Sequence, residues 1–309
     1  MATVFKYLIY LCFLAFIIGP LARIPLNLTH INLYFSDLVV MMFCLIWLFN
    51  LKSLFPYLKT DKIIRYVFLF TLVAFLSLVF SQLQLSVYER IVSFLYLLRF
   101  LAYFFIYISL KYLLDFGKIN PSHITRLLTA SGLIISLIGW LQYFLYPDLR
   151  NLYYLDWDPH YMRIFSTYFD PNFLGLMLLL SLITSFFQAN KSSLVWITRL
   201  IIFATLMFTY SRSSYLSLVA VSLFYSLWKK SVFVVGITLI LLSAMVFMLP
   251  RPGGEGVKLE RLFSLEQRIE SWRLGGKIFM NYPLFGAGFN SLRYAKRQFG
   301  ISTDDWLVS

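Results

Sequence analysis

The sequence contains few cysteine and histidine residues and few charges. Among its 309 residues there are two cysteines and three histidines, and charged residues make up 13% of the chain. Cys12 and Cys44 both fall inside apolar segments, and neither has a partner at the spacing of a metal or redox motif. We therefore interpret both cysteines as small hydrophobic residues. The sequence also lacks an internal repeat of fixed period and a low-complexity linker.

Acidic residues are particularly scarce. The chain has 14 Asp and Glu against 27 Lys and Arg, which gives a formal net charge of +13. Such a charge indicates nucleic-acid binding when basic and aromatic side chains alternate in a soluble region, and the sequence has no such patch. The positive charge instead indicates membrane topology and contact with anionic membrane lipids, so we expect no nucleic-acid partner.

Long hydrophobic runs are abundant. Hydrophobic residues form 60% of the chain, and the mean hydropathy is +0.76. A hydrocarbon core of roughly 30 Å needs about 20 apolar residues per helix, so the composition predicts an all-α, polytopic transmembrane helical bundle of about nine helices. The first run has no small-residue cleavage site after it, so we expect it to be retained. The predicted segments are Tyr7–Ala22, Leu33–Asn50, Ile63–Ser81, Ile91–Leu114, Leu127–Tyr146, Asn172–Ala189, Leu194–Ser211, Ser214–Trp228 and Val232–Leu249.

The cations of the short loops set the predicted orientation. With the N-terminus inside, eleven Lys and Arg residues fall in inner loops and five in outer loops. Because positive loops stay on the cytoplasmic side, we expect a cytoplasmic N-terminus and a final segment outside. Residues 1–249 then form the transmembrane bundle with an outward loop at 147–171, and residues 250–309 form an extracytoplasmic segment.

The outward loop combines aromatic residues with the signals of a helix start. Asp170 precedes Pro171, and this pair predicts the first turn of a helix, because the carboxylate accepts hydrogen bonds from free amides and proline lacks one. Capping does not explain Arg163, seven residues upstream of Asp170. Arg163 either extends to lipid headgroups or belongs to a functional site.

A second polar connection, TYSRSS at 209–214, joins two predicted helices that must be antiparallel neighbours because the connection is short. Ser213 or Ser214 is expected to cap the second of these helices, whose amino end carries partial positive charge. Arg212 lies beside that end, and the two together predict a binding site for phosphate oxygens. An interfacial arginine in a plain hairpin turn is the alternative.

The polar segment after residue 250 begins with an amphipathic pattern. Leucine, isoleucine and tryptophan recur at three- and four-residue spacing between Leu259 and Trp272, and the other face carries Arg268 and Arg273. Such a helix lies on the outer bilayer surface or covers the membrane domain. The Gly-x-Gly sequence at 286–288 is not a dinucleotide-binding fingerprint, because no strand precedes it.

Three blocks of the sequence resemble the O-antigen ligase and O-antigen polymerase superfamily of bacterial envelope glycan assembly. They are Arg163–Gly175 (RIFSTYFDPNFLG), Thr209–Ser214 and Arg268–Asn290 (RIESWRLGGKIFMNYPLFGAGFN). Their order and spacing are similar to the family pattern, and together they cover most of residues 160–290.

The resemblance implies an inner-membrane glycosyltransferase of the C-type architecture that acts in cell-envelope or lipopolysaccharide biosynthesis. It would transfer a glycan from undecaprenyl pyrophosphate, on the outer face of the cytoplasmic membrane, to an acceptor hydroxyl of lipid A core, a glycan or a protein. Such enzymes work with inversion at the anomeric carbon and without a metal or other cofactor. Guanidinium groups can stabilise the charge of the departing pyrophosphate. We assign this catalytic role to Arg163 and Arg212, and substrate binding to Arg268, Arg273, Asp170 and Asn172.

The family pattern also has a histidine after the Pro-Leu-x-Gly-x-Gly block. The sequence ends at Ser309 without one there, and His30, His123 and His160 do not match that position. We therefore expect the chain to be C-terminally incomplete and poorly active. Ligases and polymerases share the three blocks, so the choice between these two activities stays open, as do the acceptor and the sugar.

Two other functions fit parts of the sequence. Asp156 and Asp158, with His160 close by, resemble the acidic pair of metal-dependent oligosaccharyl transferases, although that pair usually lies in the first outward loop. Arg99 lies deep in the fourth predicted segment and suits a transporter or flippase for the lipid-linked glycan, because an intramembrane charge faces a cavity or a partner.

The remaining polarity lies mainly at the outer rim, which favours surface chemistry over transport, since a transporter needs charges along several helices. We expect Arg199 to extend to the cytoplasmic surface and Asp37 to pair with an arginine at the rim. A third class, a membrane scaffold, predicts that lysine can replace Arg163 or Arg212 without loss of function. A guanidinium clamp predicts severe loss, because an ammonium cannot form the same pair of hydrogen bonds.

Overall fold

The computed structural model of the chain describes residues 1–26, 31–155, 160–188, 192–250 and 263–300. These residues are largely helical and divide into two compact units. Unit 1 consists of Met1–Cys12, Arg23–Lys118 and Leu262–Ser309, and unit 2 of Phe13–Ala22 and Ile119–Arg261. The first helix, α1 (Ala2–Ile18), contributes its two halves to different units.

Unit 1 contains two short strands and most of the long helices. Its further elements are β1 (Arg23–Leu26), β2 (Ile31–Tyr34), α2 (Phe35–Leu48), α3 (Leu51–Thr60), α4 (Lys62–Val79), α5 (Val87–Asp115), α11 (Phe263–Asn281), α12 (Leu292–Ala295) and a 3-10 turn (Lys296–Phe299). The sequence did not indicate the antiparallel β1–β2 hairpin or the separate helix α3.

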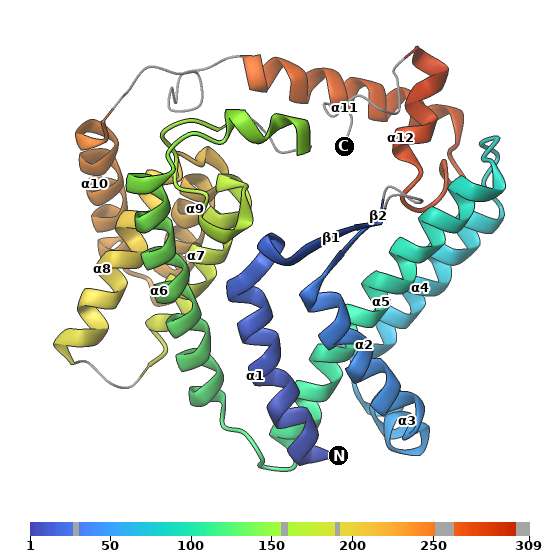
Figure 1. The fold of residues 1–309 in the computed structure, drawn as a ribbon, viewed down its shortest axis with the longest axis horizontal. Helices are drawn as coiled ribbons and strands as arrows, with labels where there is room; N and C mark the ends of the chain where they lie inside the picture. Colours follow the sequence, from blue (N-terminus) through green and yellow to red (C-terminus); the bar gives the residue numbers. More distant parts are fainter. Residues whose placement is uncertain (27–30, 156–159, 189–191, 251–262, 301–309) are drawn as a thin grey trace. The chain divides into compact units, whose positions relative to one another are not determined.

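The described residues of unit 2 form the end of α1, five further helices and three 3-10 turns, and Figure 1 shows α6 to α10 gathered into one bundle. Its elements are the turn Gly19–Ala22, α6 (Pro121–Leu145), the turns Arg150–Leu155 and Ser166–Tyr168, α7 (Pro171–Ser185), α8 (Ser193–Phe208), α9 (Arg212–Lys229) and α10 (Phe233–Met248).

Each of the nine predicted apolar segments overlaps a helix. Among the described residues, however, four helices are long and apolar enough to cross a membrane alone: α1 with its following turn, α4, α5 and α6. The pair α2 and α3 makes a fifth candidate, bent by 94°. Helices α7, α8 and α10 are apolar but have only 15 or 16 residues, below the roughly 20 that a full crossing needs. The chain thus has the helical fold of a membrane protein, and nine crossings stay a prediction.

Local capping explains where two long helices of unit 1 begin. The Asp61 carboxylate precedes α4 and accepts hydrogen bonds from the backbone N–H groups of Ile63 (2.8 Å) and Ile64 (3.1 Å). The Lys111 ammonium lies 2.9 Å from the same carboxylate, and its hydrogen bond lowers the pKa of Asp61. Ser86 and Glu89 form a reciprocal capping box at the start of α5.

An ion pair links α2 to α5 inside unit 1. Arg99 donates through Nε to Asp37 Oδ1 at 2.9 Å and through Nη2 to the other carboxylate oxygen. Tyr103 also donates to Asp37 (2.9 Å), and the hydroxyls of Ser36 and Tyr103 are 2.7 Å apart. The two unexplained charges of the predicted second and fourth segments therefore satisfy each other, as a charge in an apolar setting requires.

The segment after α11 packs on the connection between α4 and α5. Ser77 and Ser81 of that hairpin donate hydrogen bonds to the carbonyl oxygens of Phe285 and Ala287, both at 2.6 Å. Leu83 and Ile278 are both 4% exposed and lie in one small apolar cluster. The third family-like block is thus fixed to a pair of long apolar helices through backbone carbonyls and through apolar side chains.

Glycine and serine allow the helices of unit 2 to approach closely. A Cβ at Gly132 in α6 would lie 2.4 Å from the Ser181 Cβ in α7, and one at Gly175 in α7 would lie 2.3 Å from the Ser214 Oγ in α9. Small residues serve this purpose in membrane helices, where packing rather than the exclusion of water brings helices together. Bulkier neighbours fill the rest of the core, including Leu174, Leu178, Ile202, Leu206 and Met207.

Candidate functional site around Arg163 and Arg212

The loop between α6 and α7 is closed at its base by backbone hydrogen bonds. Leu149 donates its N–H to the His160 carbonyl (2.8 Å), and Met162 donates to the Pro147 carbonyl (2.9 Å). Within this closure, Arg150 binds Asp148 through two nitrogens at 2.8 and 2.6 Å, which lowers the pKa of the Asp148 carboxyl. These bonds fix the backbone of the loop immediately before Arg163.

Arg163 is buried rather than extended to the surface. Its side chain is among the largest that are fully buried, with the residue 1% exposed. Nε donates to the Thr209 carbonyl at 2.8 Å, and Nη2 lies 3.4 Å from the Tyr210 carbonyl and 3.5 Å from Asn172 Oδ1. Thr209 is the C-terminal cap of α8, so the guanidinium binds carbonyls that the helix itself leaves without N–H partners.

The backbone repeats this connection between the loop and α8. The N–H of Ile164 donates to the Phe208 carbonyl at 3.0 Å, next to the bond from Arg163 to Thr209. The loop and the end of α8 are therefore joined by main chain and side chain at two consecutive positions. Sequence reasoning did not predict this, because the partners are more than 40 residues apart.

The turn from α8 to α9 places Arg212 at the first position of α9. Tyr210 takes a left-handed conformation (φ 51°), and its hydroxyl donates to the Pro250 carbonyl at 2.5 Å. Ser211, not Ser213 or Ser214, caps α9, because its Oγ accepts from the Ser214 N–H at 3.4 Å. Arg212 is half-buried, at the amino end where the helix carries partial positive charge.

Hydroxyl groups surround this helix start. Ser211 Oγ lies 3.0 Å from Ser213 Oγ and 2.9 Å from Ser214 Oγ. Gly175 of α7 faces the same serines, and because glycine has no side chain it leaves room for that of Ser214. The helix start next to Arg212 is therefore polar and closely packed, and its packing depends on Gly175 of the neighbouring helix.

Asp170 and Asn172 have clear local roles. Asp170 caps α7 by accepting from the N–H groups of Asn172 (2.7 Å) and Phe173 (3.3 Å), which confirms the predicted helix start. Asn172 also faces Arg163. The structure thus brings Arg163, Arg212, Asp170 and Asn172 into one region of unit 2.

The other two predicted site residues belong to unit 1. Arg268 and Arg273 are exposed on α11. Arg199, expected to extend to the surface, is 6% exposed and donates to the Ser185 carbonyl at 2.7 Å, with its guanidinium against the rings of Phe186 and Trp196. This prediction was wrong, because α7 ends at the level of Arg199 and offers its last carbonyls as partners.

Asp156 and Asp158, the basis of the metal-dependent alternative, lie outside the described residues. Among the residues that the structure does describe, no group of three His, Cys, Asp or Glu side chains is placed to hold a metal ion.

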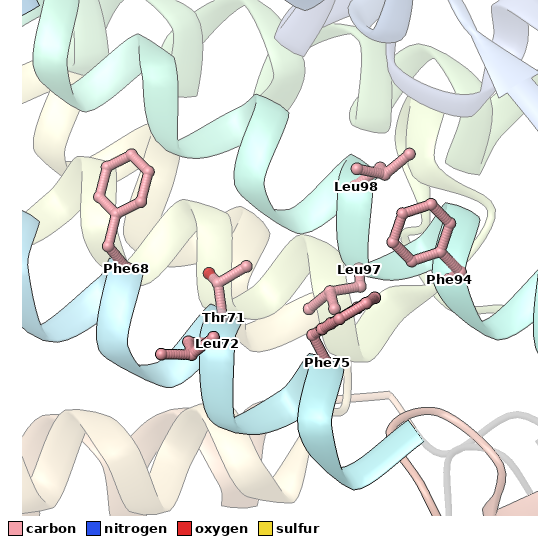
Figure 2. Close-up of a pocket in the computed structure, with 7 residues that line it drawn as sticks. All are labelled: Phe68, Thr71, Leu72, Phe75, Phe94, Leu97 and Leu98. Carbon is pink, nitrogen blue, oxygen red and sulfur yellow. The ribbon is translucent and has the colours of Figure 1, made fainter. Parts of the chain in front are cut away.

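A separate groove lies between α4 and α5 in unit 1. It has a volume of about 270 Å³, and Figure 2 shows its lining of phenylalanine, leucine and one threonine. The hydroxyl of that threonine, Thr71, donates to the Val67 carbonyl of its own helix at 2.8 Å. The groove therefore offers hydrocarbon contacts and no polar chemistry, unlike the region around Arg212.

Sequence reasoning missed Gln142, whose amide contacts the backbone of the arginine loop from α6. The available signal was a polar residue near the end of an otherwise apolar predicted segment, Leu127–Tyr146.

Comparison with known proteins agrees with the likeness of the second and third blocks. Residues 197–307 match the family model of the O-antigen ligase, a range that includes the Arg212 turn and the α11 segment. No curated protein and no solved structure matches the chain significantly. The match covers about a third of the chain, makes residues 197–307 similar to the O-antigen ligase family, and supports a general role in membrane glycan transfer.

Proposed function

We propose that the chain is a membrane glycosyltransferase that moves a glycan from undecaprenyl pyrophosphate to an acceptor hydroxyl on the outer face of the bacterial cytoplasmic membrane. The observation that carries this proposal is the placement of Arg212 at the first position of α9, beside a cluster of serine hydroxyls. This arrangement provides a guanidinium at a helix amino end for a diphosphate, and the buried hydroxyls of Ser211 and Ser214 hold that helix end in place.

The chemistry requires stabilisation of the leaving group. As the acceptor oxygen forms its bond to the anomeric carbon, the bond from that carbon to the pyrophosphate oxygen breaks, and negative charge builds on the phosphate oxygens. Arg212 is the residue that we assign to contact these oxygens directly. Its fixed positive charge and forked N–H groups can replace a divalent cation in this role.

Arg163 stabilises the negative charge on the phosphate oxygens indirectly, from its buried position next to the turn that precedes Arg212. Its guanidinium is bonded to the carbonyls of Thr209 and Tyr210, so it fixes the two residues that precede the α9 cap. We therefore assign Arg163 to the positioning of the turn and to the local positive potential. Asn172 joins this arrangement through its contact with Arg163, and Asp170 holds the first turn of α7.

We assign Arg268 and Arg273, which are exposed on α11, to contacts with the donor glycan or the acceptor. Their segment is fixed to the α4–α5 hairpin by Ser77 and Ser81, which makes α11 a suitable carrier for contacts to the donor glycan or the acceptor. No donor contact is assigned to the apolar groove of Figure 2.

Contacts between helix ends in unit 2 group these ends as the predicted topology requires, whichever side of the membrane they face. In unit 2, segments predicted to face outward bind one another: Tyr168 donates to the Phe16 carbonyl at 2.7 Å, and Tyr210 to that of Pro250. Gln188 and Thr129, predicted near inner ends, are joined at 2.7 Å. Labelling of single cysteines at position 150, which is exposed in the same loop as Arg163, and at position 212, in a chain with the native cysteines replaced, tests the proposed sidedness. Cytosolic labelling at these positions would overturn the proposal.

The decisive experiment measures binding of undecaprenyl pyrophosphate to the chain in lipid nanodiscs. Arg212→Lys should weaken binding at least about tenfold, because lysine keeps the charge but loses the forked geometry. Arg150→Lys is the matched control, since Arg150 is an exposed arginine of the adjacent loop with its own carboxylate partner. Equal affinity of the Arg212→Lys variant and the unchanged chain would reject the assigned role and favour a scaffold.

Two further measurements separate the alternatives. Loss of glycan transfer with EDTA and recovery with manganese would favour metal-dependent transfer over the arginine-based site. Movement of lipid-linked glycan across a reconstituted membrane, without a new glycosidic bond, would favour a transporter. The Asp37–Arg99 pair and the bonded Arg199 give such a transporter little support, because these charges already have protein partners.

A further inference from the structure

Gln142, near the end of α6, holds the backbone of the loop that carries Arg163. Its Oε1 accepts from the N–H groups of Phe165 (3.0 Å) and Ser166 (3.3 Å). Its Nε2 lies 2.9 Å from the Tyr146 carbonyl and 3.4 Å from the Arg163 carbonyl. The partners fix the amide orientation, since two N–H donors require the oxygen and two carbonyls require the NH₂ group.

The conformation of this loop needs such a restraint. Met162, Ser166 and Phe169 all have left-handed backbone angles, with φ of 53°, 50° and 56°. For residues other than glycine this region is strained, and it persists only where the surroundings determine it. Gln142 provides three contacts to main-chain groups around these positions, at Arg163, Phe165 and Ser166.

The loop in turn is connected to the residues before Arg212. Gln142 contacts the carbonyl of Arg163, and the Arg163 guanidinium binds the Thr209 carbonyl. The next residue, Ile164, donates to Phe208 at 3.0 Å. A continuous series of hydrogen bonds therefore runs from α6, through the loop, to the turn that begins α9.

We infer that Gln142 is a positioning residue of the donor site: it holds the loop conformation in which Arg163 fixes the 209–212 turn and thereby orients Arg212. This inference rests on the proposed function. Gln142 itself makes no contact with the donor in this arrangement. Its loss should weaken donor binding through misplacement of Arg212.

The test compares two glutamines of unit 2. Gln188 also links neighbouring helical elements, by donating to Thr129 Oγ1 at 2.7 Å and approaching the Thr125 carbonyl at 3.4 Å. Gln142→Met should raise the dissociation constant for undecaprenyl pyrophosphate about tenfold or more, because small displacements of an orienting group have large effects on such sites. Gln188→Met should change it less than about twofold for a comparable loss of thermal stability.

A second variant gives a signature that general destabilisation does not produce. In Gln142→Glu, the neutral acid has an oxygen that accepts from the loop amides and an O–H that donates to a carbonyl, whereas the carboxylate has no donor. Binding by this variant, relative to the unchanged chain at the same pH, should therefore recover as the pH falls through the pKa of the introduced acid. Gln142→Met should show no such recovery. This comparison also decides the matter if the methionine variant does not fold.

The outcomes separate this inference from the proposed function. If Arg212→Lys weakens binding but Gln142→Met does not, the positioning role is rejected and the donor site stands. If the Gln142 and Gln188 variants weaken binding equally, Gln142 contributes to general stability, and the inference is again rejected. If Arg212→Lys binds normally, the donor site is rejected, and the inference with it.

Discussion

Replacement of Gly175 by alanine tests the close approach of α7 and α9 beside the candidate site. A Cβ at this position would lie 2.3 Å from Ser214 Oγ, 3.0 Å from Ser214 Cβ and 3.3 Å from Ser211 Cβ. Ordinary contact begins near 3.4 Å, so Ser214 must move. Because Ser214 and Ser211 form the hydroxyl cluster at the α9 cap, the movement should also disturb Arg212.

The size of the effect follows from two opposing contributions. Alanine is favoured over glycine in a helix by about 1 kcal/mol, and overpacking of a filled interior costs about 1–3 kcal/mol. Gly236, in the first turns of α10, has no atom within 4 Å of its Cβ position, so Gly236→Ala isolates the favourable part. The free energy of unfolding should therefore be about 1–3 kcal/mol lower for Gly175→Ala than for Gly236→Ala.

Equilibrium unfolding in mixed micelles, followed by tryptophan fluorescence, measures this difference. The double variant Gly175→Ala with Ser214→Gly removes the clashing atoms and should regain most of the stability lost through overpacking. Undecaprenyl pyrophosphate binding should fall in Gly175→Ala and remain unchanged in Gly236→Ala. Equal stability of the two alanine variants would show that α7 and α9 do not approach as described, and the reasoning would fail.

Three further perturbations test other parts of the fold. Arg99→Met leaves the buried Asp37 carboxylate without its main partner and should destabilise the chain by about 3 kcal/mol in the same unfolding assay, whereas an unchanged midpoint would contradict the pairing. Glu89→Gln removes the partner of Arg297, so tryptic cleavage after Arg297 should become faster; an unchanged rate would argue against this docking contact. The neighbouring ammonium lowers the pKa of Asp61, so the carboxylate stabilises the fold fully above the ordinary aspartate pKa, and this contribution is lost as pH falls through the lowered value. Asp61→Asn should consequently reduce the thermal midpoint at pH 7 and reduce its acid dependence, and parallel pH curves for the two chains would oppose this.

The sequence predicted helices well where composition and capping act locally. The segment Ile63–Ser81 corresponds to α4 at Lys62–Val79, because an uninterrupted apolar run follows a capping aspartate. Asp170 and Pro171 predicted the start of α7 for the same reason. The short hairpin β1–β2 was missed, since four-residue strands give little periodic signal.

The site was only partly predictable from the sequence. Arg163 and Arg212 were identified from family-like blocks, but the burial of Arg163 depends on carbonyls 46 and 47 residues away, and main-chain groups leave no mark in a sequence. The contact of Gln142 with Phe165 and Ser166 was hidden for a similar reason. Its presence in an apolar segment was nevertheless a usable signal, because a buried amide needs partners.

The way the segment after α11 is attached has a consequence for sequence drift. Ser77 and Ser81 bind carbonyl oxygens of positions 285 and 287, and every amino acid supplies such an oxygen. Substitutions at these two positions can therefore accumulate without loss of these two hydrogen bonds. Gly288 has no such freedom, because its φ of 103° and the nearby Ser81 side chain exclude a larger residue. Among relatives of this chain, Gly288, Ser77 and Ser81 should persist while positions 285 and 287 vary more.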